Sequence, residues 1–158
     1  MKSFKLIPVG AALALYIAAS ASAFAVTVSP AGSISLTGST TLTKSGIAVG
    51  CSANMVGSVT SAGAISITSA SFSGNALCAG VTATGLPWTG QVLSTTSLSL
   101  SGVAVHTLLG ACEPSTISAA VTENPNPQQT IIGLSNQALS GGCSVSGSLT
   151  TTPYLSIQ

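Results

Sequence analysis

Apolar and polar residues alternate along almost all of the chain after residue 25, and this period of two restricts the fold more than any other feature. In Ser33–Thr37 and Ala64–Thr68, for example, every second residue is large and apolar. Successive side chains of a strand point to opposite faces, so this pattern produces one apolar and one polar face. The pattern recurs in Ile47–Cys51, Val56–Thr60, Leu98–Leu100, Val103–Val105, Ile117–Val121, Thr130–Leu134, Cys143–Val145 and Leu155–Ile157. The sequence therefore predicts an all-β protein.

Short turn sequences rich in Gly, Pro, Asn and Ser separate the alternating runs. Ser61–Gly63 lies between two runs and predicts a hairpin over Val56–Phe72, and Asn124–Gln129 predicts a second, longer hairpin. Roughly ten short strands at close spacing are typical of a β-sandwich or a barrel. We expect residues 24–158 to form a single antiparallel β-sandwich domain of the immunoglobulin-like kind.

The N-terminal residues have the three parts of a secretory signal peptide. Lys2 and Lys5 provide a basic start, Leu6–Ala19 is an apolar stretch, and Ala21–Ala23 supplies the small residues that signal peptidase requires. The apolar stretch is short for a bilayer core of roughly 30 Å. We expect cleavage after residue 23, with cleavage after residue 25 as the alternative. The mature protein is then predicted to be secreted, either extracellular or at the cell surface, with the periplasm as a further location.

Charge is nearly absent from the predicted mature chain. The full sequence has three lysines, no arginine, two glutamates and no aspartate, and two of the lysines belong to the predicted signal peptide. Lys44, Glu113 and Glu123 remain, which gives a net charge of −1 with His106 neutral. Binding to nucleic acid or to anionic lipid requires several cations, so we expect neither as a partner. A surface of hydroxyl and amide groups with so little charge suits close contact with apolar material or with copies of itself.

The four cysteines of an exported chain predict two disulfides, which could pair in three ways. A weak internal repeat favours one of them. Cys51 opens the first predicted hairpin and Cys78 follows it, and Cys112 and Cys143 flank the second hairpin in the same manner. We therefore expect the pairs Cys51–Cys78 and Cys112–Cys143. No closely spaced cysteine pair or histidine cluster supports a metal or redox site instead.

No residue pattern predicts catalysis or a cofactor. His106 is the only histidine and falls on the polar side of an alternating run, as an exposed strand residue would. Glu113 and Glu123 both lie in predicted turns, and nothing in the sequence places them around one cleft. We expect no catalytic, cofactor-binding or metal-binding residues and no enzymatic activity. Trp88, the single tryptophan, is either a core residue or an apolar contact for a ligand.

Four segments carry a resemblance to a known family. They are Ile65–Gly74 leading to Cys78, Leu86-Pro87-Trp88, Cys112–Thr116 and Asn136–Cys143. With these segments and its predicted signal peptide, the chain resembles the PraB family, the protein activators of alkane oxidation. The resemblance implies a secreted, non-catalytic helper in the use of long-chain hydrocarbons.

Two functions follow as hypotheses from these features. The first is help in hydrocarbon use through binding to an apolar surface or an oil–water interface, which the low charge would suit. The second is a self-associating fimbrial or biofilm-matrix fibre subunit, in which residues 24–43 would complete the sheet of a neighbouring copy by strand exchange.

Overall fold

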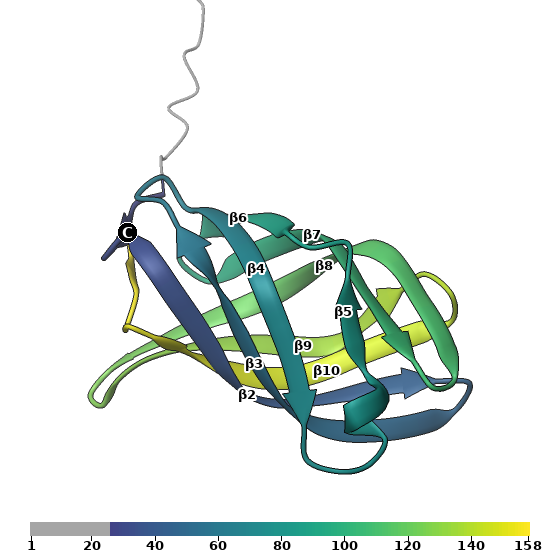
Figure 1. Cartoon of the computed structure of the whole chain (residues 1–158). Coiled ribbons are helices and arrows are strands. Elements are labelled where there is room, and N and C mark those ends of the chain that lie inside the picture. The colour runs from purple at the N-terminus through teal and green to yellow at the C-terminus, as the bar shows by residue number, and fades with distance from the viewer. Residues whose placement is uncertain (1–25) are drawn as a thin grey trace, which may run out of the picture.

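The computed structural model describes residues 26–158, which form eleven β-strands and one short 3₁₀ turn, η1 (Figure 1). The elements are β1 (Val28–Ser29), β2 (Gly32–Lys44), β3 (Ile47–Val59), β4 (Ala64–Ser73), η1 (Cys78–Gly80), β5 (Thr82–Thr84), β6 (Trp88–Ser94), β7 (Ser97–Thr107), β8 (Gly110–Pro125), β9 (Gln128–Leu139), β10 (Cys143–Thr152) and β11 (Ser156–Ile157). The all-β prediction is confirmed. The predicted signal peptide lies outside the described residues.

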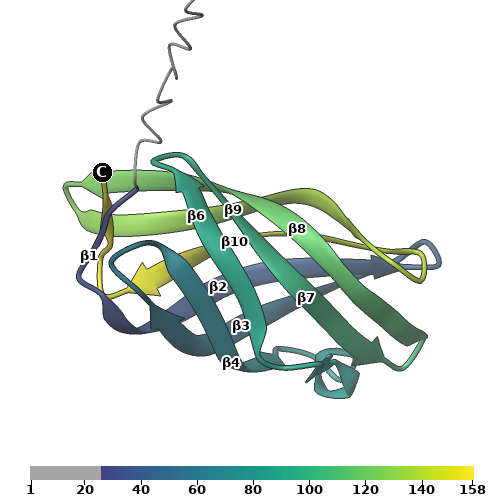
Figure 2. The ribbon, with the colours of Figure 1, turned by 90° about the horizontal axis from the view of Figure 1, so that it is seen from above.

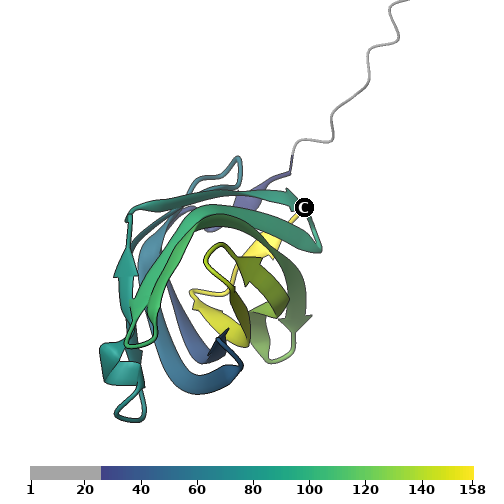
Figure 3. The same cartoon turned by 90° about the vertical axis from the view of Figure 1, so that its right-hand side faces the viewer.

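Eight strands close into an antiparallel barrel. In the described chain β2, β3, β4, β6, β7, β8, β9 and β10 each pair with the next of this series, and β10 then pairs with β2 from Cys143 opposite Lys44 to Thr152 opposite Ser35. Short β5 pairs with the last part of β7, beyond the segment of β7 that pairs with β6. Figure 3 looks into one end of this ring. The expected immunoglobulin-like β-sandwich is therefore wrong, because the sheet closes on itself.

The interior of the barrel is a single apolar core. Along β3, every second residue from Cys51 to Val59 is buried, whereas the residues between them are exposed. The other barrel strands contribute inward-facing aliphatic residues in the same way, and Trp88 is buried among them. The outer face carries mainly Ser and Thr, as the alternation predicts, although Ile47, in phase with the buried Cys51, is exposed.

Glycines at inward-facing positions let the strands bend tightly enough to close. A Cβ at any of them would collide with the backbone of the neighbouring strand: Gly38 with Ser148, Gly57 with Ser66, Gly90 with Ser99 and Gly147 with Ser39. The strand pairing is also shifted by irregularities between Val56 and Gly57 and between Val145 and Gly147. Bulges and inward glycines are the devices by which a sheet acquires curvature, so these positions form the corners of the barrel.

Both predicted hairpins are present. The β3–β4 hairpin turns at residues 60–63. The β8–β9 hairpin turns at Asn126–Pro127, so its connection is shorter than the sequence predicts.

The N-terminal strand of the barrel lacks the free edge that the fibre hypothesis requires. Residues 32–44 form β2 and are paired on both edges, by β3 and by β10, so this strand has no free edge to offer to a neighbouring copy.

Two disulfides hold the strands and the 3₁₀ turn together. They join Cys51 to Cys78 and Cys112 to Cys143, with Cα–Cα distances of 5.7 and 5.8 Å, and these are the pairs expected from the internal repeat. The first attaches η1 to β3, and the second connects the beginnings of β8 and β10. Each closes a long loop of the unfolded chain, so each should contribute substantially to stability.

Glu123 fastens the C-terminal strand to the barrel. Its carboxylate accepts hydrogen bonds from the Tyr154 hydroxyl at 3.0 Å and from the Ile157 backbone N–H at 2.9 Å. Strand β11 pairs with β1 beside this contact, and the pair lies at the end of the barrel that carries the C-terminus (Figure 2). The hydrogen bond to Glu123 raises the pKa of the Tyr154 phenol above its ordinary value of 10.0, with burial acting in the same direction.

The raised pKa of Tyr154 predicts a loss of stability at alkaline pH. The folded state binds the phenol proton more tightly than the unfolded state, so this contribution is complete below the unfolded pKa of 10.0 and is lost as pH rises through the folded value. We expect the free energy of unfolding, measured by urea denaturation between about pH 8 and pH 12, to fall at the alkaline end. Tyr154→Phe should reduce this fall. An identical alkaline fall in Tyr154→Phe would contradict the assignment.

Candidate functional site at the apolar end of the barrel

One end of the barrel exposes a cluster of large apolar side chains. It consists of Ile47, Val49, Leu77, Leu108 and Leu109, and we call it the apolar end. The exposed fractions are 69% for Leu108, 47% for Ile47, 46% for Leu77 and 42% for Leu109. Only two other large apolar residues of the described chain are comparably exposed, Val56 and Leu93. The concentration of such residues at one end of a hydroxyl-covered barrel indicates a contact surface.

Three separate connections bring the apolar end together. The β2–β3 turn contributes Ile47, and its central residues Ser45 and Gly46 have φ values of 52° and 79°, the conformation of a tight hairpin. The segment around η1 contributes Leu77. The β7–β8 turn contributes Leu108 and Leu109. Figure 3 faces this end, with η1 beside the turns of the barrel.

Contacts within these connections fix their positions. The Thr107 hydroxyl donates to the Gly110 carbonyl at 2.8 Å and accepts the Leu109 N–H at 3.0 Å, which holds the β7–β8 turn. Gly80 of η1 lies so close to the Leu108 side chain that a Cβ there would have a Leu108 side-chain carbon at 2.5 Å. The β7–β8 turn is therefore fixed by hydrogen bonds, and Leu108 packs against η1 although most of its surface faces solvent.

Lys44, the last residue of β2, ties this strand to β8 and to the β9–β10 turn. Its ammonium donates to the carbonyl of Ala111, near the start of β8, at 2.6 Å and to that of Gly141, in the β9–β10 turn, at 2.9 Å. Lys44 is the only lysine or arginine in the described part of the chain. Its ammonium is occupied by backbone carbonyls, so it contributes to the architecture of the barrel end.

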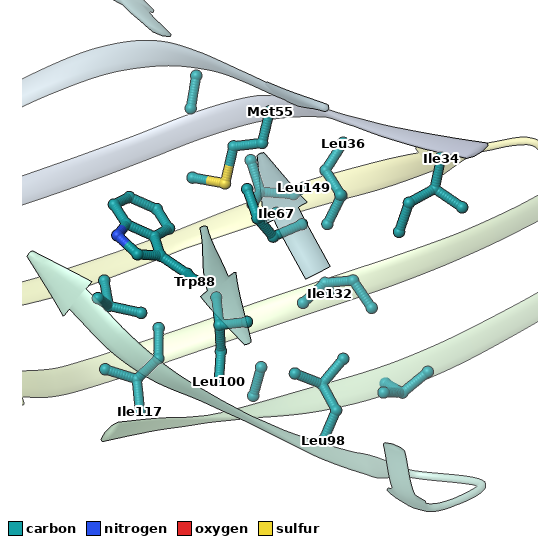
Figure 4. Close-up of a cluster of buried hydrophobic side chains, with 14 of the residues drawn as sticks. Ile34, Leu36, Met55, Ile67, Trp88, Leu98, Leu100, Ile117, Ile132 and Leu149 are labelled. Atoms are coloured by element: carbon teal, nitrogen blue, oxygen red, sulfur yellow. The ribbon is translucent and has the colours of Figure 1, made fainter. Parts of the chain in front are cut away.

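Behind the apolar end, the barrel encloses an apolar cavity of about 90 Å³. Figure 4 shows part of its wall, in which Met55, Ile67, Trp88 and Leu100 converge from different strands. Eight-stranded barrels are just wide enough to be filled by side chains or to hold one small ligand, and this barrel is filled incompletely. The cavity thus offers a second candidate site.

Trp88 lies in the wall of the cavity and not on the surface. Its side chain is 1% exposed, and its indole N–H donates to the Thr84 carbonyl at 2.8 Å. Of the two interpretations open from the sequence, the structure favours a core position, although the indole also lines space that a ligand could enter. The single tryptophan is therefore placed to report on that space.

The cavity and the depression at the apolar end adjoin each other. Leu42 of β2 and Val81, between η1 and β5, line both the interior cavity and a depression of about 110 Å³ at the apolar end. Both side chains are only partly buried. Only these side chains would therefore lie between the cavity and an apolar molecule held in the depression.

His106 and Glu113 lie on the paired strands β7 and β8, with His106 opposite Ala111, whereas Glu123 lies ten residues beyond Glu113 on β8. His106 is exposed near the β7–β8 turn, and Glu113 is exposed further along β8. Glu123 is engaged by Tyr154 and Ile157. Residues 26–158 contain no group of three or more His, Cys, Asp or Glu side chains arranged to hold a metal ion. The sequence did not predict the apolar end: Leu77, Leu108 and Leu109 lie between strands, and the alternating run Ile47–Cys51 predicts a buried face for Ile47 and Val49, which lie at the start of β3.

Within residues 26–158 no helix has the length and hydrophobicity needed to cross a bilayer. Neither curated proteins nor solved structures match this chain. A family model described as "Alkane oxidation protein activator PraA/PraB-like" matches residues 1–158, the whole sequence. The chain therefore belongs to the PraA/PraB-like family of alkane oxidation activators.

Proposed function

We propose that this protein is an exported, non-catalytic helper in hydrocarbon use, and that it adheres to hydrocarbon surfaces through the apolar end of its barrel. The observation that carries the proposal is the position of Ile47, Leu77, Leu108 and Leu109, four strongly exposed apolar side chains at a single end of the barrel. The family description supports an apolar partner, because it names alkane oxidation as the process that its members activate.

The physical chemistry of the surface supports adhesion by this end. Burying one leucine or isoleucine side chain is favourable by roughly 1.5–3 kcal/mol, so several together can hold a protein at an oil–water boundary. The outer face of the strands, rich in Ser and Thr, would stay in water. The barrel would then stand on the droplet with its apolar end inward. Export of the protein, as the signal peptide predicts, would bring it into contact with external hydrocarbon.

Replacing two leucines of the apolar end tests this proposal. We expect Leu108→Asn combined with Leu109→Asn to weaken binding to hexadecane droplets roughly tenfold or more, because less apolar surface leaves water. The protein should be expressed with its own N-terminal segment and purified after export, so that the uncleaved apolar stretch of residues 6–19 does not itself bind oil. Droplet binding is measured by depletion of protein from the aqueous phase.

Val56→Asn combined with Leu93→Asn is the matched control, since these residues are also strongly exposed but do not line the depression at the apolar end. The control should bind droplets as the unchanged protein does. Equal losses in both variants would refute a site-specific contact. Sedimentation of the same samples tests for contact with copies of the chain. A dimer that Leu108→Asn converts to monomer, without any change in droplet binding, would assign the apolar end to self-association and overturn the proposal.

A further inference from the structure

We infer that the cavity inside the barrel binds the end of a single saturated alkyl chain, which enters from the apolar end. The proposed function concerns a surface, whereas this inference concerns an interior site and rests on that function only for the class of ligand. The observation behind it is the combination of an unfilled, almost purely apolar barrel interior with an adjoining apolar depression that shares Leu42 and Val81 with it.

The lining of the cavity selects an uncharged, apolar ligand. Among its side chains only Thr40 and Trp88 carry an oxygen or a nitrogen. The Thr40 hydroxyl donates to the Cys51 carbonyl at 3.4 Å, and the Trp88 indole donates to the Thr84 carbonyl at 2.8 Å. Within residues 26–158 no buried side-chain nitrogen or oxygen lacks a hydrogen-bond partner. No side-chain group in the wall is therefore left to hold water or the polar part of a ligand, and such cavities stay dry.

The dimensions favour part of a chain over a whole molecule. The interior volume of about 90 Å³ is smaller than the cavity of about 150 Å³ that accommodates benzene in another protein. It therefore suits the terminal part of a slender alkyl chain. The outer depression of about 110 Å³ would hold the following segment, with the chain passing Leu42 and Val81.

The route is bordered by elements that the fold holds in place. The Cys51–Cys78 disulfide attaches η1 beside the entrance, and Cys51 itself lines the cavity. Leu77 precedes this turn and Val81 follows it, so one tethered segment contributes both to the outer depression and to the passage. A chain end would thus enter a preformed site, which keeps the entropic cost of binding low.

Quenching of Trp88 fluorescence tests the inference directly, because bromine quenches an indole only at close contact. The probe is 1-bromohexane, and 6-bromohexanoate is its charged counterpart. In the exported protein, whose predicted cleavage removes no tryptophan, we expect saturable quenching by 1-bromohexane and at least roughly tenfold weaker quenching by the carboxylate, which would have to desolvate its charge. Quenching of equal strength by the two probes would overturn the assignment to an uncharged chain.

Ala119→Leu should fill the cavity and weaken quenching by 1-bromohexane roughly tenfold or more. Ala120→Leu is the matched control, because Ala119 is buried and lines the cavity whereas its neighbour on β8 is exposed. Val81→Phe, at a partly buried position in the passage, gives a second test if Ala119→Leu does not fold. Unchanged quenching in a folded cavity variant would overturn the inference.

The two proposals can fail separately. Droplet binding without saturable Trp88 quenching would leave the surface function intact and reject the interior site. Saturable quenching that persists in the Leu108→Asn and Leu109→Asn variant, together with undiminished droplet binding, would reject the surface function and retain the interior site.

Discussion

Replacing Gly57 by alanine is expected to lower the free energy of unfolding by about 3 kcal/mol, a large effect for a single methyl group. Gly57 occupies an inward-facing position of β3 at an irregularity in the pairing with β4. An added Cβ would collide with the Ser66 carbonyl oxygen and lie 2.9 Å from the Ile67 Cα. These are backbone atoms of the neighbouring strand, so the clash can be relieved only by moving β3 and β4 apart.

Gly50→Ala is the control for this substitution. Gly50 lies on the same strand, but its Cβ would point to the outside, where the nearest atom is the Thr41 hydroxyl oxygen at 4.0 Å. We expect a change within about 0.5 kcal/mol or a slight gain, because alanine restricts the unfolded chain more than glycine does. Urea denaturation followed by Trp88 fluorescence measures both variants. Similar stabilities for Gly57→Ala and Gly50→Ala would show that Gly57 is not a corner of the barrel.

The position of Gly57 also shows how much of the fold could be predicted from the sequence. The predicted runs Ile47–Cys51 and Val56–Thr60 both fall almost wholly within the single strand β3, and the hairpin predicted over Val56–Phe72 is present. Alternation does not reveal whether the first and last strands pair, because a sandwich and a barrel bury the same face. A usable sign of closure was present. Gly57 falls in phase with the buried residues Met55 and Val59, where a sandwich core would normally place a larger side chain.

The candidate site was less predictable than the fold. Trp88 was recognised from the sequence as either a core or a contact residue, and the structure places it where it lines the interior cavity. Ile47, Leu77 and Leu108 were not recognised. Leu77 and Leu108 lie in connections between strands, where an exposed leucine does not by itself indicate a site, and Ile47 belongs to an alternating run that predicts a buried residue. Only the closure of the barrel brings the three turns to one end, so the site depends on the feature that alternation could not predict.

Removing the two disulfides one at a time is expected to separate stability from binding. Each bridge closes a loop of similar length, with sequence separations of 27 and 31 residues. The chain-entropy model gives a loss of about 3–4 kcal/mol for either one. Replacing both members of each pair by alanine and measuring urea denaturation tests this. A difference of less than about 1 kcal/mol between unchanged protein and either variant would contradict the model.

The effects on hydrocarbon contact should differ between the two bridges. Loss of Cys51–Cys78 frees the segment from Leu77 to Val81, which borders both the apolar end and the passage. The other bridge, Cys112–Cys143, connects β8 and β10, and neither of its cysteines lines the passage. We therefore expect the first variant to lose affinity both for hexadecane droplets and for 1-bromohexane under conditions in which it remains folded, and the second to retain both. Equal binding by the two folded variants would show that the tether of η1 is not needed to form the entrance, because an untethered segment would then adopt the binding arrangement at no measurable cost.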